Sequence, residues 1–175
     1  WRQTVEAKID NQYRLLSKLG ADGNILKPLM MNVKSGDTDN REGQAAKLYW
    51  KMLFGNDFCR EREGDPPNNL LNYGYSVLRA AVARGLMGSG LMPAFGIFHR
   101  NRYNAFPLAD DIMEPFRPYV DEIVHCLFFN GETELNKEVK ATLLGVLNAD
   151  ARYEKLLRPL DVGISFTTAS LAKCM

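Results

Sequence analysis

The sequence predicts an all-α protein that folds as a helical bundle. Apolar residues recur every three to four positions through nearly every patterned segment, which is the period of an amphipathic helix. Gly20 and Gly55 directly follow two of these segments and would stop a helix there. No segment alternates apolar and polar residues as a strand would. With 175 residues and 46% hydrophobic content, residues 1–175 are expected to form a single domain with a core of its own.

The first 69 residues are expected to hold two clear helices. The first has apolar positions from Val5 to Leu19, and the second runs through residues 45–54. Residues 24–33 between them read as a short helix or an irregular linker, and residues 34–40 as a polar turn. Residues 56–69 form a charged loop, in which Asn68 or Asn69 is a candidate N-cap for the next helix.

Four further helical segments follow. Residues 70–88 are apolar or small on most faces, as expected of a long central helix that is largely buried. Residues 108–129 continue the helical pattern, and Pro115 and Pro118 are expected to kink it. Residues 135–147 and 162–173 complete the bundle.

Composition excludes some classes of function and leaves others open. The net charge is +1, so a DNA-binding site would have to be a local patch on a balanced surface. Three cysteines without CxxC spacing favour reduced thiols in the cytoplasm over a disulfide framework or a zinc site. No apolar run approaches the roughly 20 residues that span a bilayer. The charged N-terminus does not resemble a signal peptide, and without an initiator Met the chain is expected to be part of a longer protein.

One imidazole and several carboxylates form the most informative pattern. His99 follows a glycine-containing turn, Glu114 lies in a carboxylate-rich helical segment after it, and Glu42 lies in the first turn of an earlier helix. Together such groups could bind a hard divalent cation and leave positions open for substrate. Each also has a plainer interpretation. Asp39 with Glu42, and Asp111 with Glu114, fit the spacing of a helix capping box, and a single histidine after an apolar run is often structural.

His125 is the competing histidine. It shares a helical face with Glu114 and Asp121, which could itself bind metal. The apolar residues beside it indicate a helix that turns into the core, so we interpret His125 as structural. Arg117 and Asp121 read as an ion pair four residues apart, and Tyr75 is expected in the core.

Five stretches carry a resemblance to a known family. They are AKIDNQ at residues 7–12, SGDTDNREGQAAKLYWKMLFG at 35–55, NLLNYGYSVLRA at 69–80, GLMPAFGIFH at 90–99 and LADDIMEPFRPYVD at 108–121. In this order they resemble the catalytic domain of the CRISPR adaptation integrase, most closely that of type II systems. Beyond about residue 130 the likeness is only a general helical pattern.

The resemblance implies a function and a site. It implies that Glu42, His99 and Glu114 hold Mg²⁺ or Mn²⁺, with Asp110 or Asp111 as an additional acid, and that these ligands face the surface. The reaction would be attack of a DNA 3′-hydroxyl on a phosphodiester of the CRISPR repeat, without a nucleotide energy source. The arginines that could contact the DNA backbone are Arg41, Arg79, Arg84, Arg100, Arg102 and Arg117.

The resemblance also implies partners. Family members carry an N-terminal β-rich domain, which these residues do not contain, and the full-length protein is expected to form a homodimer largely through it. A small non-catalytic adaptation subunit, protospacer DNA and the repeat would be the other partners, in a prokaryotic cytoplasm. Two rival interpretations remain: a DNA-binding scaffold whose acids only cap helices, and a general metal-dependent nuclease that cleaves DNA without joining ends.

Overall fold

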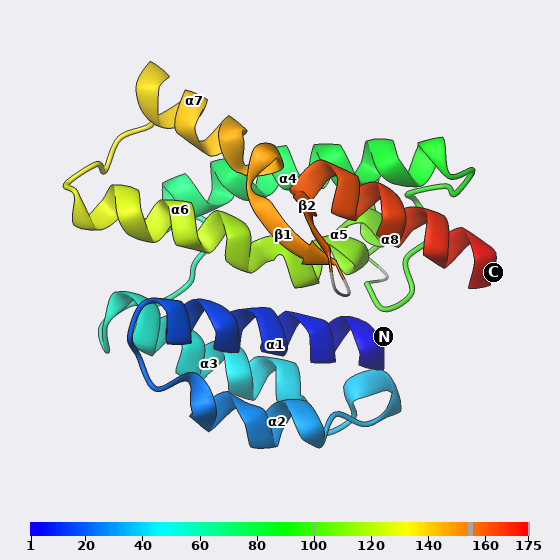
Figure 1. Cartoon of the computed structure of the whole chain (residues 1–175), viewed down its shortest axis with the longest axis horizontal. Coiled ribbons are helices and arrows are strands. Elements are labelled where there is room, and N and C mark those ends of the chain that lie inside the picture. Colours follow the sequence, from blue (N-terminus) through cyan, green and yellow to red (C-terminus); the bar gives the residue numbers. More distant parts are fainter. Residues whose placement is uncertain (100, 154–155, 175) are drawn as a thin grey trace.

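The helices lie in two layers that meet along the first helix. The computed structural model of the protein describes residues 1–99, 101–153 and 156–174. Helices α1, α2 and α3 form one layer, and α4 to α8 form the other (Figure 1). The α-helices are α1 Arg2–Lys18, α2 Lys27–Met31, α3 Arg41–Phe54, α4 Asn68–Gly88, α5 Pro107–Met113, α6 Arg117–Phe129, α7 Lys137–Leu144 and α8 Leu160–Cys174. Short 3₁₀ turns lie at η1 Gly23–Leu26, η2 Ser35–Asp37, η3 Glu114–Phe116 and η4 Gly145–Asn148.

The secondary structure of the described residues is helical apart from one short hairpin, which confirms the predicted all-α bundle. Each layer of helices has its own buried cluster. The smaller cluster joins α1 and α3 through residues such as Ile9, Leu16 and Tyr49. The larger one surrounds α4, which packs against α5, α6, α7 and α8 and is the long central helix that its sequence predicts. Helix α1 contacts both η3 and α6, and it therefore connects the two layers. No helix of the described ranges is long and apolar enough to cross a membrane.

A buried carboxylate also joins the layers. Asp121 on α6 accepts hydrogen bonds from the hydroxyl of Tyr49 on α3, at 2.7 Å, and from that of Tyr75 on α4. All three side chains are buried. Burial raises the pKa of Asp121 to about 6, although the two tyrosine hydroxyls and Arg117 act in the opposite direction. The expected Arg117–Asp121 ion pair is therefore wrong, because Asp121 is instead held by the two tyrosines.

A small hairpin departs from the expected bundle. Strands β1 Asp150–Tyr153 and β2 Leu156–Pro159 pair antiparallel, with Asp150 opposite Pro159 and Tyr153 opposite Leu156. Every residue of β2 is exposed and only one residue of β1 is buried. The strands thus lack a buried face, and with it the alternation by which a sequence predicts strands.

Other boundaries shift for local reasons. Residues 24–33 form η1 and α2, and residues 135–147 form α7 followed by the tighter turn η4. The expected kink between residues 108 and 129 is present, because η3 separates α5 from α6 at Pro115. Neither proposed asparagine caps α4: the helix begins at Asn68 itself, whose side chain bonds the 59–61 segment instead.

Candidate metal and DNA-processing site

A lysine ammonium group joins two of the predicted ligands. The Nζ atom of Lys8 lies 2.6 Å from Oε1 of Glu42 and 2.6 Å from Oε2 of Glu114. These residues come from α1, α3 and η3, so the contact lies where the two layers meet. The three side chains are 12%, 20% and 5% exposed respectively, and the cluster is therefore mostly shielded from water.

Glu42 reaches this cluster because other residues cap its helix. Asp37 accepts hydrogen bonds from the backbone N–H groups of Arg41, at 2.8 Å, and of Glu42, at 3.0 Å. Asn40 adopts a left-handed conformation and accepts from the N–H of Gly43. The capping-box interpretation of Asp39 with Glu42 is therefore wrong, and the Glu42 carboxylate is left to bind Lys8.

Glu114 is held from two sides at the bend between α5 and α6. Its Oε1 atom lies 2.8 Å from Nη2 of Arg117, and its Oε2 atom faces Lys8 without a well-directed hydrogen bond. Burial opposes ionisation, yet Lys8 and Arg117 outweigh it and lower the pKa of Glu114. The residue is only 4% exposed, so the expectation that all three ligands face the surface is wrong for Glu114.

His99 is fixed by a different carboxylate. Its Nδ1 lies 2.5 Å from Oδ1 of Asp111, and the same carboxylate accepts hydrogen bonds from the backbone N–H groups of Ile97, Phe98 and His99. Burial works against the ionised form of Asp111, but these bonds prevail and lower its pKa. The hydrogen bond to Asp111 raises the pKa of His99, although partial burial opposes this.

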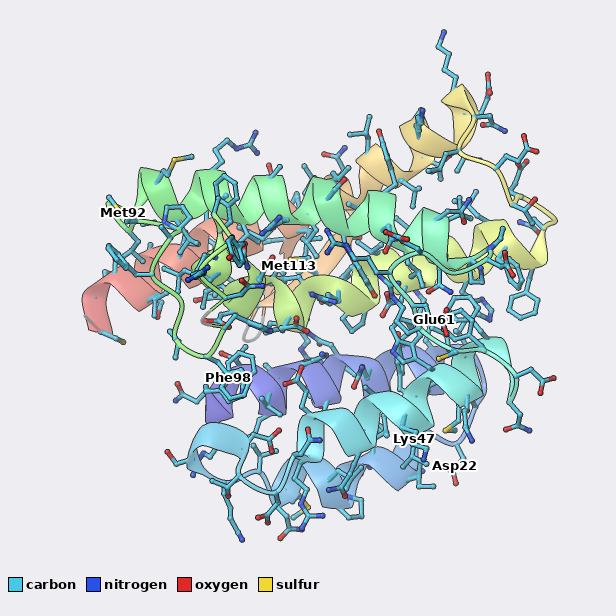
Figure 2. All side chains as sticks on the ribbon, turned by 180° about the vertical axis from the view of Figure 1, so that it is seen from behind. Asp22, Lys47, Glu61, Met92, Phe98 and Met113 are labelled. Carbon is cyan, nitrogen blue, oxygen red and sulfur yellow. The ribbon has the colours of Figure 1, made fainter. Side chains whose placement is uncertain are left out.

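The turn before His99 has little space for side chains. A Cβ atom on Gly96 would collide with the carbonyl oxygen of His99 and approach Pro107 and Asp111, so glycine is required there. On the outer side Phe98 stacks on Trp1, with ring centroids 4.3 Å apart. Figure 2 shows Phe98 on the loop beside the first turn of α1. The turn is thus anchored to α5 by Asp111 and to α1 by Trp1.

Asp110 and Asp111, which the sequence leaves as alternatives for the additional acid, bind different partners in the structure. Asp111 is fully buried, and both of its carboxylate oxygens bind the turn that ends at His99, so the capping-box interpretation of Asp111 with Glu114 is wrong. Asp110 pairs with Arg79, at 2.8 and 3.0 Å, and accepts from Asn104. Lys8 forms its ion pairs with Glu42 and Glu114, whereas Asp111 orients His99 and Asp110 fixes Arg79.

The structure joins two of the predicted ligands through Lys8 and relates the third, His99, to them only through its charge, so they do not form a complete metal site. Among residues 1–99, 101–153 and 156–174, no three His, Cys, Asp or Glu side chains are arranged to hold a metal ion. The ammonium of Lys8 lies between the two carboxylates that would have to share such an ion.

The candidate DNA-binding arginines do not form one group. Arg117 pairs with Glu114 and lies over the ring of Tyr75, while Arg41 lies beside Glu42 at the start of α3. Arg102 is exposed on the loop after His99. Arg84 instead lines a surface pocket of about 300 Å³ between α4 and α8. Arg100 lies outside the described residues.

His125 contributes to aromatic packing. Its ring lies 4.5 Å from that of Phe129 and 6.0 Å from that of Phe54, measured between centroids. Partial burial lowers its pKa, with an opposing contribution from Glu122. The absence of Glu114 and Asp121 from its surroundings agrees with a structural role, because these acids bind Lys8, Arg117 and the two tyrosines.

Lys8 is the residue of this site that the sequence interpretation missed. It stands in the AKIDNQ stretch at residues 7–12, which contributed to the family resemblance without being assigned a role. Asn11 in the same stretch donates a 2.7 Å hydrogen bond to the carbonyl of Pro115 and fixes α1 against η3. The three-residue spacing of Lys8 and Asn11 places both on one helical face. This spacing was the signal in the sequence that the two residues contact the same neighbouring segment, η3.

Comparison with known proteins identifies the family. The family described as CRISPR associated protein Cas1 matches residues 1–159. A CRISPR-associated endonuclease Cas1 of Neisseria meningitidis serogroup C is 43% identical over 159 residues, which cover 89% of this chain and 52% of that protein. A second Cas1 endonuclease, from Pyrobaculum aerophilum, is 28% identical over 98% of this chain and 62% of its own length. The chain thus spans about half the length of the Neisseria relative.

Solved structures share the fold at low identity. A Cas1 protein from Thermotoga maritima superposes with a TM-score of 0.77 at 22% identity, over 98% of this chain and 63% of that one. A casposase bound to integration product gives 0.76 at 23% identity, over 98% and 58% of the two chains. With the sequence match to most of the chain, these likenesses lead to one conclusion: the chain belongs to the Cas1 family and has the fold of its C-terminal helical domain.

Proposed function

We propose that this chain is the catalytic domain of an integrase that inserts new spacers into a CRISPR array. The observation that carries the proposal is the convergence of Glu42 and Glu114, from different layers of the bundle, on the one positive charge of Lys8. The Asp111-bound His99 is near enough for its charge to lower the pKa of Glu114. Its relatives are named endonucleases, and structural neighbours include a casposase bound to integration product and Cas6-RT-Cas1–Cas2 complexes.

The donor groups suit a hard divalent cation. Glu42 and Glu114 already bind a cation, and Oε2 of Glu114 is buried without a directed hydrogen bond. The bond from Nδ1 of His99 to Asp111 leaves Nε2 as the nitrogen for a ligand, an arrangement common for histidines that bind metals. Carboxylate oxygens with one imidazole suit Mn²⁺ and tolerate Mg²⁺. We infer that Glu42, His99 and Glu114 would hold the ion, which when bound would polarise the scissile phosphate and neutralise developing charge.

The remaining residues prepare the site for an anionic substrate. Arg117 pairs with Oε1 of Glu114 while Lys8 pairs with Oε2, and the two positive charges keep this buried carboxylate ionised. Asp111 fixes the orientation of the imidazole, and Arg41 stands beside Glu42, where it can contact a DNA phosphate. In the reaction a DNA 3′ oxygen would bond to phosphorus as the bond to the departing 3′ oxygen breaks. One phosphodiester replaces another, so no nucleotide energy source is required.

The proposal also includes partners. Double-stranded protospacer and repeat DNA would be the substrates, and a second copy of the protein and a small non-catalytic adaptation subunit would complete the assembly in a prokaryotic cytoplasm. Two of the structural neighbours are described as complexes that contain Cas2, which supports a partner subunit here.

A strand-transfer assay tests this function. Labelled DNA with free 3′-hydroxyl ends is incubated with a repeat-containing plasmid, the full-length protein that carries this domain, and Mn²⁺ or Mg²⁺. We expect covalently joined products that disappear with EDTA or in the Glu42→Ala variant, and persist in Glu138→Ala, which changes an exposed glutamate on α7. Metal-dependent cleavage without joined products would instead indicate a general nuclease. DNA binding without any reaction would indicate a scaffold.

A further inference from the structure

Lys8 occupies the position between two proposed metal ligands. Its Nζ atom is 2.6 Å from an oxygen of Glu42 and 2.6 Å from an oxygen of Glu114. An ion bound by both carboxylates would need to lie within about 2.0–2.6 Å of their oxygens. The ammonium and such an ion therefore compete for the same oxygen atoms and the same space.

The charges around Glu114 make this competition strong. Glu42 and Glu114 carry two negative charges, and Lys8 with Arg117 carries two positive charges, so the cluster is balanced as it stands. A divalent ion added beside Lys8 would leave two excess positive charges in a mostly buried cluster. Withdrawal of the ammonium removes one of them and frees the Oε2 atom of Glu114, which receives no well-directed hydrogen bond from Lys8.

The two cations that hold Glu114 differ in what they can do. Arg117 binds the other oxygen of Glu114 and lies over the ring of Tyr75, where the planar guanidinium is fixed. Lys8 carries a compact charge on a flexible stem and can change rotamer without disturbing α1. Lys8 is thus the cation that can move away, and Arg117 is the one that stays.

We propose that Lys8 is a positioning residue of the metal site: an internal cation that holds Glu42 and Glu114 together and is displaced when a divalent ion binds. The inference rests on the proposed function, since it takes these carboxylates as metal ligands. It assigns Lys8 control over metal affinity. The residue keeps the acids ionised and close together without metal, and it weakens binding of the ion by competing with it.

Direct Mn²⁺ binding tests the inference. Free Mn²⁺ is measured by electron paramagnetic resonance during titration of the purified protein, its Lys8→Met variant and its Lys18→Met variant. Lys18 is a matched control because it lies on the same helix and also pairs with a glutamate, Glu122, but is 66% exposed and lies roughly three helical turns away from Lys8. We expect Lys8→Met to bind Mn²⁺ about tenfold more tightly, as removal of a like charge beside a partly buried ion implies. Lys18→Met should bind as the unchanged protein does.

The possible results separate the inference from the proposed function. Equal affinity of Lys8→Met and the unchanged protein, or weaker binding by Lys8→Met, would overturn the role of Lys8 and leave the metal site standing. Absence of Mn²⁺ binding to all three proteins would overturn both. Lys8→Arg, which keeps the charge, should show no gain in affinity, and tenfold tighter binding by this variant would count against competition by charge.

A measurement on the unchanged protein covers the case in which the variants fail to fold. Acylation of lysines is followed by mass spectrometry with and without Mn²⁺. Lys8 is ion-paired and only 12% exposed in the structure. If Mn²⁺ displaces its ammonium, acylation of Lys8 should become faster when Mn²⁺ is added, while the rate at Lys18 should stay unchanged. A rate at Lys8 that stays constant or falls with bound Mn²⁺ would show that the ammonium is not displaced.

Discussion

Asp111 holds His99 through both its ring and its backbone. One carboxylate oxygen lies 2.5 Å from Nδ1 of the imidazole and 3.1 Å from the backbone nitrogen of the same residue. The other accepts from the N–H groups of Ile97 and Phe98. Because Asp111 is fully buried on α5, it converts a short loop into a rigid support for one imidazole.

Loss of this support should reduce metal binding and activity. In Asp111→Asn one of the two accepting oxygens is replaced by an NH₂ group, which donates hydrogen bonds and cannot accept them. The amide therefore cannot bind the three backbone N–H groups and the imidazole at the same time. We expect Mn²⁺ affinity and strand transfer to fall by about 10- to 100-fold, as for other partners of metal-binding histidines. Asp110→Asn is the control: it alters the adjacent carboxylate, which binds Arg79 rather than His99. Equal losses in the two variants would contradict a specific role for Asp111.

The three proposed ligands should differ in their effects on stability. In the full-length protein, Glu42→Ala, His99→Ala and Glu114→Gln are each expected to abolish strand transfer. Only Glu114→Gln should also be strongly destabilising, by about 3–5 kcal/mol, because it leaves two cations near a buried site without their shared carboxylate. Urea denaturation followed by circular dichroism measures this. Full strand transfer by any of the three variants would remove that residue from the proposed site.

Much of this arrangement followed from the sequence, and the exceptions have physical causes. The long apolar helix α4 and the bend at Pro115 were predictable, since helical period and proline geometry are local properties. Asp121 was assigned to Arg117, four residues away on the same helix side, but two distant tyrosine hydroxyls bind it. Lys8 was missed because a lysine in an amphipathic helix is typical of a solvated face. Its role depends on the approach of α3 and η3, which no local pattern encodes.

The buried Asp121 predicts an unusual dependence of stability on pH. Its pKa in the folded protein is about 6, above the ordinary value of 3.8, so between these values the folded state binds more protons than the unfolded state. Its stabilising contribution is therefore present at pH 4 and is lost as the pH rises through 6. Asp121→Asn cannot titrate and serves as the reference.

The measured quantity is the difference in the free energy of unfolding between the unchanged protein and Asp121→Asn. We expect this difference to fall as the pH rises from 4 to 7, by at most about 1.4 kcal/mol per pH unit, and to level off above pH 7. Subtraction of the variant removes the contributions of Asp111 and Glu114, whose pKa values are lowered and whose effects have the opposite sign. A difference that rises with pH would mean that Tyr49, Tyr75 and Arg117 stabilise the ionised carboxylate more than burial opposes it.

Residues 1–175 purified alone should fold but integrate DNA poorly. Two buried clusters, joined by Lys8 and Asp121, provide these helices with a core of their own, and circular dichroism should show a cooperative thermal transition. Integration at two ends of one DNA requires two active sites at a fixed separation, and this chain spans only about half of its Neisseria relative. With a net charge of +1, its binding to DNA should be weak and should fall steeply with salt. Efficient two-ended integration by these residues alone, scored by gel analysis of the joined products, would show that the helical domain itself supplies the pairing of active sites.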